Sequence, residues 1–100
     1  MADEFARALL LMRRRDPQLA EDGFQRLRGI AAEHVDRLID EFRRETDHGV
    51  RCWLLELIAQ ARAPRAAALL TAQSRSDDES LRAWAEQGLR LLDAKEPVTP

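Results

Sequence analysis

The chain has 100 residues and a mass of 11.4 kDa, which is enough for one small domain. Ala and Leu dominate the 45% of hydrophobic residues and β-branched residues are few, so the composition favours helices over strands. A net charge of −2, from 16 basic and 18 acidic residues, argues against a dedicated nucleic-acid-binding protein. We therefore expect an all-α fold.

Three aspartates mark the turns of the predicted structure. Asp16, Asp47 and Asp78 are each 31 residues apart, and each follows a short stretch that contains arginine. Arginines in the last turn of one helix, followed by an aspartate that caps the next, are typical of a helical hairpin. The pattern predicts six helices in three hairpins, at about residues 3–14, 17–32, 33–45, 48–62, 64–74 and 79–92.

The segments after these aspartates repeat at the same 31-residue shift. Leu19, Val50 and Leu81 fall at one position, and Trp53 matches Trp84. A repeat of this length that holds two helices predicts an α-solenoid. Its units would cover about residues 3–32, 33–62 and 64–93 of a single domain over 1–94, with 95–100 as a flexible tail. The other apolar positions correspond in the same way: Gly23, Leu54 and Ala85; Leu27, Ile58 and Leu89; Ile30, Ala61 and Leu92.

The second helix of two hairpins shares a further pattern. An aspartate is followed three residues later by a hydrophobic residue and Arg, then by a small residue and a leucine-like residue at helical spacing. In the third hairpin these are Asp78, Leu81–Arg82, Ala85 and Leu89; in the second they are Asp47, Val50–Arg51, Leu54 in place of the small residue, and Ile58. This pattern resembles HEAT repeats, closest to the short form of about 30 residues found in phycobilin-lyase-type proteins.

The resemblance implies an α-α superhelix and a structural role for four residues. In HEAT repeats the aspartate and arginine tie successive repeats together through hydrogen bonds and ion pairs, which carries over to Asp47, Arg51, Asp78 and Arg82. The first hairpin has Ala20 in place of the arginine, as a degenerate end repeat would.

The resemblance also implies a function, because the second helices of HEAT repeats line a face that commonly binds other molecules. We expect a non-catalytic module that binds a partner protein through this face. Leu55 is an apolar residue on an otherwise polar stripe and is therefore a candidate contact. The polar candidates are Glu56, Glu86, Gln87 and Arg90.

Trp53 and Trp84 are the most informative aromatic residues. Lying one repeat apart, they are expected side by side on neighbouring helices. Either they stack between repeats, or they stand partly exposed as anchors for a partner.

The sequence predicts no enzyme, cofactor or metal site. His34 and His48 lie far apart, with no carboxylate at metal-ligand spacing, and His48 is expected at the surface of a helix start. Motifs for nucleophiles and phosphate-binding glycine loops are absent. Cys52 is expected to lack a partner histidine and to be a half-buried helical residue.

Other functions stay open. The chain fits a small immunity or antitoxin protein that inhibits a toxin enzyme, and a lyase- or chaperone-like accessory protein. A nucleic-acid-binding HEAT-like protein would use the Arg13–Arg15 cluster, but the balanced charge disfavours it.

Partners and location complete these expectations. A second copy or a partner is expected to cover the solenoid ends, near Phe5 and Leu91–Leu92. The acidic start, Asp3 and Glu4, is unlike a signal peptide, and no apolar run is long enough for a membrane span, so we expect a cytoplasmic protein.

Overall fold

The computed structural model describes residues 3–95, and this part of the chain is all-helical, as predicted. Each of the six expected helices is present within a few residues of its expected bounds. Lys95 belongs to the last helix and not to a tail, and residues 96–100 lie outside the described residues. The elements are α1 (Glu4–Met12), α2 (Pro17–Ile30), a 3₁₀ turn (Ala31–Glu33), α3 (Val35–Arg44), α4 (His48–Gln60), a second 3₁₀ turn (Pro64–Ala66), α5 (Ala67–Gln73) and α6 (Glu79–Lys95).

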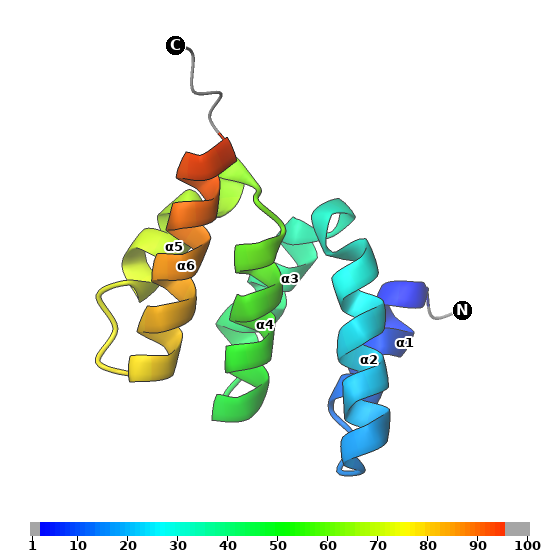
Figure 1. Cartoon of the computed structure of the whole chain (residues 1–100). Helices are drawn as coiled ribbons and strands as arrows, with labels where there is room; N and C mark the ends of the chain where they lie inside the picture. Colours follow the sequence, from blue (N-terminus) through cyan, green and yellow to red (C-terminus); the bar gives the residue numbers. More distant parts are fainter. Residues whose placement is uncertain (1–2, 96–100) are drawn as a thin grey trace.

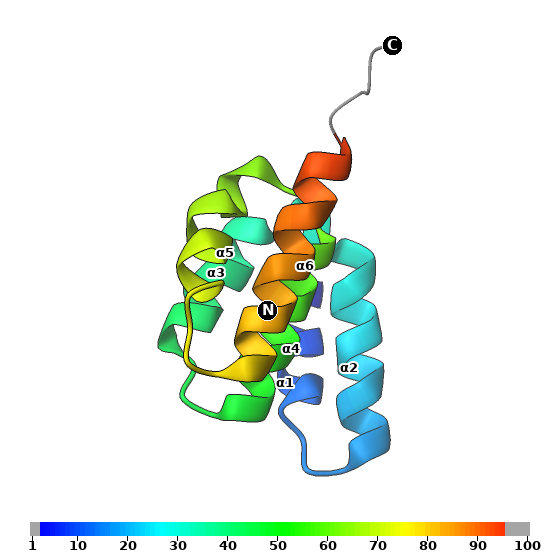
Figure 2. The ribbon, with the colours of Figure 1, turned by 60° about the vertical axis from the view of Figure 1, so that its left-hand side comes forward.

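The helices form two groups. In Figure 1, α2, α4 and α6 lie in front and run in the same direction, with α1, α3 and α5 behind them. Figure 2 shows α3 and α5 together to one side of α4 and α6. Consecutive helices pack in pairs, α1 with α2, α3 with α4 and α5 with α6, and α4 also packs against α6. None of the described helices combines the length and hydrophobicity that a membrane crossing requires.

The three aspartates cap helices, as their spacing predicts. Asp16 accepts hydrogen bonds from the N–H groups of Gln18 and Leu19, at 2.8 and 3.3 Å. Asp47 accepts one from Val50 at 3.0 Å, and Asp78 accepts one from Leu81 at 2.9 Å. Each carboxylate satisfies an N–H group that the first turn of a helix leaves without a partner. These caps fix the starts of α2, α4 and α6.

Helix α4 lies at the centre of the core. It contacts α2, α3 and α6, and five of its side chains have no exposed surface. Because neighbours cover it on several sides, its buried residues occupy more than a single stripe. These residues are Leu54, Leu55, Leu57, Ile58 and Ala59.

Arg51 holds the turn between α3 and α4. Its Nη1 donates to the carbonyl oxygens of Phe42 and Glu45, at 2.9 and 3.0 Å, and its guanidinium lies 4.1 Å from the centre of the Phe42 ring. The carbonyls at the end of α3 lack partners within that helix, so the arginine satisfies them. Arg82 does the same for the next turn by donating to the carbonyl of Ser76 at 3.0 Å.

The implied link between successive repeats needs correction for these arginines. Arg51 and Arg82 bind within their own hairpins, because each reaches back over the turn that precedes its helix. Asp78, by contrast, does reach the previous hairpin: its Oδ2 lies 2.6 Å from Nε2 of His48. The N–H of Leu81, with His48, holds the pKa of Asp78 below its usual range.

Ion pairs join the ends of α1 and α3. Arg13 pairs with Glu45 at 2.7 Å and Glu41 at 3.2 Å, and Arg37 pairs with Asp3 at 2.5 Å. Burial alone would raise the pKa of Glu45, but the N–H of Asp47 and the guanidinium of Arg13 hold it below its usual range. Arg13, from the best basic cluster of the sequence, is thus engaged with acidic residues.

Gly23 permits the close packing of α1 against α2. A Cβ atom at this position would lie 2.4 Å from the backbone N of Met12 and 2.6 Å from the carbonyl O of Ala8. Backbone atoms of a neighbouring helix cannot move aside as a flexible side chain can. The separation of the two helices therefore depends on the missing side chain.

We expect Gly23→Ala to lower the free energy of unfolding by about 3 kcal/mol, because α1 must move away from α2. Gly29, in the same helix, is the matched control: a Cβ there meets nothing within 4 Å. Gly29→Ala should raise stability by up to about 1 kcal/mol, since alanine favours the helix. Urea unfolding followed by circular dichroism measures both changes, and equal effects of the two variants would contradict this packing.

We expect Arg51→Ala to lower stability by about 2 kcal/mol, since it removes two hydrogen bonds and the contact with Phe42. Arg82→Ala should cost about 1 kcal/mol, because one hydrogen bond is lost. Arg43→Ala, at an exposed position of α3, should stay within about 0.5 kcal/mol of the parent. Thermal and urea unfolding give the order, and an effect of Arg51→Ala no larger than that of Arg43→Ala would refute the structural role.

Candidate functional site

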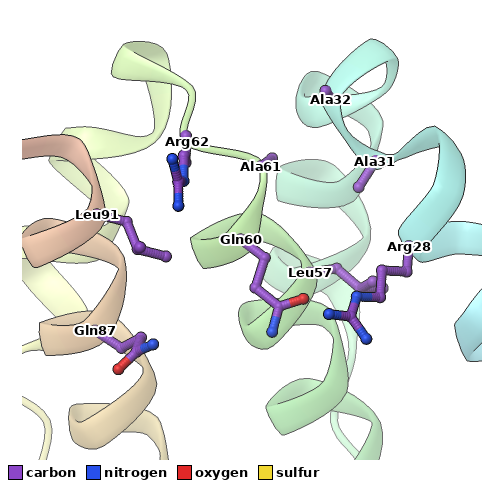
Figure 3. Close-up of a pocket in the computed structure, with 9 residues that line it drawn as sticks. All are labelled: Arg28, Ala31, Ala32, Leu57, Gln60, Ala61, Arg62, Gln87 and Leu91. Atoms are coloured by element: carbon purple, nitrogen blue, oxygen red, sulfur yellow. The ribbon is translucent and has the colours of Figure 1, made fainter. Parts of the chain in front are cut away.

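A groove crosses the C-terminal halves of α2, α4 and α6. It has a volume of about 370 Å³. Figure 3 shows Gln87 and Leu91 of α6 on one side, Arg28 and Ala31 on the other, and Gln60 between them. Both polar and apolar side chains line it: Arg28, Ala31, Ala32, Leu57, Gln60, Ala61, Arg62, Gln87 and Leu91.

Gln60 carries a buried oxygen without a hydrogen-bond partner. Its Nε2 donates to Glu56 at 3.4 Å, whereas its Oε1 is shielded from solvent and no group of the described chain donates to it. The reverse orientation of the amide would place its carbonyl oxygen against the carboxylate of Glu56. A buried acceptor left unpaired costs about 1–3 kcal/mol, so this glutamine is an unfavourable choice for stability.

Arg62 also adopts an unfavourable conformation beside the groove. Its φ of 54° lies in the left-handed region, and it is the one described residue other than glycine with a positive φ. It follows the last residues of α4, at a position where glycine is the usual choice. A left-handed conformation costs a residue with a Cβ roughly 1–2 kcal/mol.

The groove also concentrates charge. Arg28 and Arg62 line it, and Glu56 is half-buried next to Gln60. Burial raises the pKa of the Glu56 carboxyl, the positive charge of Arg28 lowers it, and Glu21 raises it further. Positive side chains beside an unpaired acceptor suit a ligand that offers both carboxylates and N–H donors.

The structure gathers some of the sequence-derived candidates at this groove. Gln87 lines it, Glu56 bonds to Gln60, and Arg90 donates to Oε1 of Gln87 at 3.3 Å. Glu86 is exposed on the same helix. Gln60 was not among the candidates, although it lies four residues after Glu56 and thus one turn along the same helix face.

The expectation for Leu55 is wrong, because this side chain has no exposed surface and cannot contact a partner. The polar stripe assumed for α4 is interrupted here by the packing of the helices around α4. The exposed large apolar residue of the described chain is Leu10 of α1, at 64% exposure. Phe5, expected near an open end, is 2% exposed and lies against His34 and Arg37.

The two tryptophans are half-buried, and they do not stack on each other. The ring of Trp53 instead packs against that of Phe24, with centroids 5.0 Å apart and an angle of 43° between the planes. This contact joins α4 to α2, so the expected packing role holds for Trp53 with a different partner. Trp53 also lines a second hollow of about 340 Å³, together with Met12, Ala20, Asp47, Gly49 and Val50.

The expectation that Cys52 lacks a partner histidine is wrong as well. His48 precedes it by four residues on α4, and its Nε2 lies 3.6 Å from Sγ of Cys52. The exposed position expected for His48 is confirmed. Burial raises the pKa of the Cys52 thiol, and the carboxylate of Asp78 adds to the rise. The spacing of His48 and Cys52 was a signal in the sequence; the approach of Asp78 was not.

Comparisons of the chain with protein-family models, curated proteins and solved structures found no match. The resemblance to HEAT repeats therefore depends on the residue pattern that carries it, and it stays a prediction.

Proposed function

We propose that the protein is a non-catalytic module that binds a partner protein through the groove across α2, α4 and α6. We further propose that its three hairpins form a HEAT-like stack, with both partners meeting in the cytoplasm. The observation that carries the binding proposal is the unpaired Oε1 of Gln60 inside the groove.

The order of the helices supports a stack of hairpins. Each pair of consecutive helices packs together, and α2, α4 and α6 run in the same direction (Figure 1). The caps Asp16, Asp47 and Asp78 start these three helices at a constant interval of 31 residues. A repeated unit of this kind presents corresponding side chains side by side, which makes an extended binding surface.

Two costly residues support binding at the groove. Apolar replacement of Gln60 and glycine in place of Arg62 would each favour stability, yet both residues line the same hollow. Groups that lower stability concentrate at functional sites, because the ligand compensates for them when it binds. Elsewhere in the described chain, buried side-chain polar atoms have partners.

The chemistry of the groove indicates an acidic, extended segment of the partner. A backbone N–H of such a segment would donate to Oε1 of Gln60, and an Asp or Glu side chain would pair with Arg28. Leu57 and Leu91 would pack against an apolar side chain of the same segment. Because helices hold the groove in place, little conformational entropy is lost on binding.

We expect a random peptide library displayed on phage, selected against the full chain, to yield extended acidic sequences. Arg28→Glu should weaken their binding at least about tenfold, because it replaces an attractive charge with a repulsive one. Gln60→Leu should weaken binding similarly and raise the free energy of unfolding by about 1 kcal/mol, since it removes the unpaired acceptor. Titration calorimetry with synthetic peptides and urea unfolding measure these effects.

Arg26→Glu is the matched control, because Arg26 is an exposed arginine of α2 that does not line the groove. It makes the same change of charge and should leave peptide affinity within about twofold. Peptides that bind parent, Arg28→Glu and Gln60→Leu equally well would exclude the groove as their site. A selection that yields no peptide would contradict the proposal as a whole.

A further inference from the structure

Three different ligand-type side chains meet at the opposite end of α4 from the groove. His48 Nε2, Cys52 Sγ and a carboxylate oxygen of Asp78 all lie within 4.8 Å of one another. His48 and Cys52 project from α4 one turn apart, and Asp78 reaches them from the turn before α6. The cluster therefore joins two hairpins at the starts of their second helices.

The geometry separates two kinds of chemistry. In a Cys–His–Asp catalytic arrangement, the histidine uses one ring nitrogen for the nucleophile and the other for the carboxylate. Here the same nitrogen, Nε2, lies 3.6 Å from the Cys52 sulfur and 2.6 Å from Oδ2 of Asp78. Three donor atoms that converge in this way surround a point instead of forming a relay, as ligands of a metal ion do.

We propose that His48, Cys52 and Asp78 bind one Zn²⁺ ion. Imidazole nitrogen, thiolate sulfur and carboxylate oxygen are the three ligand types that zinc takes in proteins, whereas Mg²⁺ and Ca²⁺ favour oxygen. With bonds of about 2.05 Å to nitrogen and 2.3 Å to sulfur, tetrahedral zinc places these two atoms about 3.5 Å apart. The 3.6 Å between His48 and Cys52 matches this value.

The third ligand requires a small adjustment. Tetrahedral zinc separates its nitrogen and oxygen ligands by about 3.4 Å, so His48 and Asp78 must move about 0.8 Å further apart. The His48 side chain is 60% exposed and can swing outward. Oδ1 of Asp78 accepts the hydrogen bond from Leu81, and Oδ2 faces His48, so one oxygen can bind the ion while the other keeps the helix cap.

Binding has a defined balance of charge and protons. The thiol of Cys52 releases its proton to solvent, and the thiolate and the Asp78 carboxylate neutralise the two charges of the ion. Three protein ligands leave the fourth tetrahedral position to a water molecule or another small ligand. Because Asp78 and His48 belong to different hairpins, the ion links α4 to α6 and stabilises the folded chain.

The test uses the full chain without a polyhistidine tag, together with Zn²⁺ and Co²⁺. We expect one Zn²⁺ per chain, measured by mass spectrometry of the metal and by competition with a chromophoric chelator. Co²⁺ should give the visible bands of tetrahedral coordination and a near-ultraviolet thiolate band. Zn²⁺ should also raise the melting temperature.

His48→Gln, Cys52→Ser and Asp78→Asn should each weaken Zn²⁺ binding more than about a hundredfold, since even the loss of a residue that only supports a ligand weakens binding 10–100-fold. Asparagine is as good a helix cap as aspartate, so Asp78→Asn removes the ligand charge while keeping the cap. His34→Gln and Asp47→Asn are the matched controls: a second histidine and a second capping aspartate, both outside the cluster. Both should retain the parent affinity.

Three results would overturn the site. They are the absence of stoichiometric Zn²⁺ binding by the parent, equal affinities of the parent and the His48→Gln variant, and a Co²⁺ spectrum without a thiolate band. If Cys52→Ser fails to fold by circular dichroism, His48→Gln decides, because the exposed side chain contributes little to the core. The cluster lies apart from the groove, so peptide binding and zinc binding can fail independently.

Discussion

The constraint on which the structure depends is the burial of α4 on several sides. The chain gains its core by placing this helix against α2, α3 and α6, and five of its side chains have no exposed surface as a result. Burial of a leucine or isoleucine contributes about 1.5–3 kcal/mol, so these positions dominate the hydrophobic stabilisation. The other helices each cover one part of α4, and their caps and turns fix where they do so.

This burial also decides where chemistry can occur. The middle of α4 is closed by its neighbours, so polar side chains of this helix meet other hairpins at its two ends. At the start, His48 and Cys52 meet Asp78. At the end, Gln60 and Arg62 line the groove with Arg28 and Gln87. One rigid helix thus carries both proposed sites, which keeps their geometry fixed relative to the core.

The local features of the fold could be predicted from the sequence. Helix periodicity and the three capping aspartates depend on neighbouring residues alone, so the helix starts at Asp16, Asp47 and Asp78 are confirmed. Leu55 could not be predicted as buried, because the pattern assumed that α4 has one buried face. The three-way packing that buries Leu55 is a tertiary effect, which a single helix does not reveal.

The candidate sites were predictable only in part. Glu56 and Gln87 were placed on the binding face by periodicity, and they lie at the groove. Gln60 and Arg62 became evident only from the missing hydrogen bond and the positive φ. The spacing of His48 and Cys52 indicates two groups on one helix face, whereas the third member, Asp78, comes from 26 or more residues further along the chain.

Native-state hydrogen exchange tests the central position of α4 most directly. If the other helices pack around it, the amides of residues 54–58 should exchange only through global unfolding and should be the best protected in the chain. Amides in α1 and at the helix ends should exchange faster, through local opening. Exchange in α4 that is faster than in α2 or α6 would contradict its place at the centre of the core.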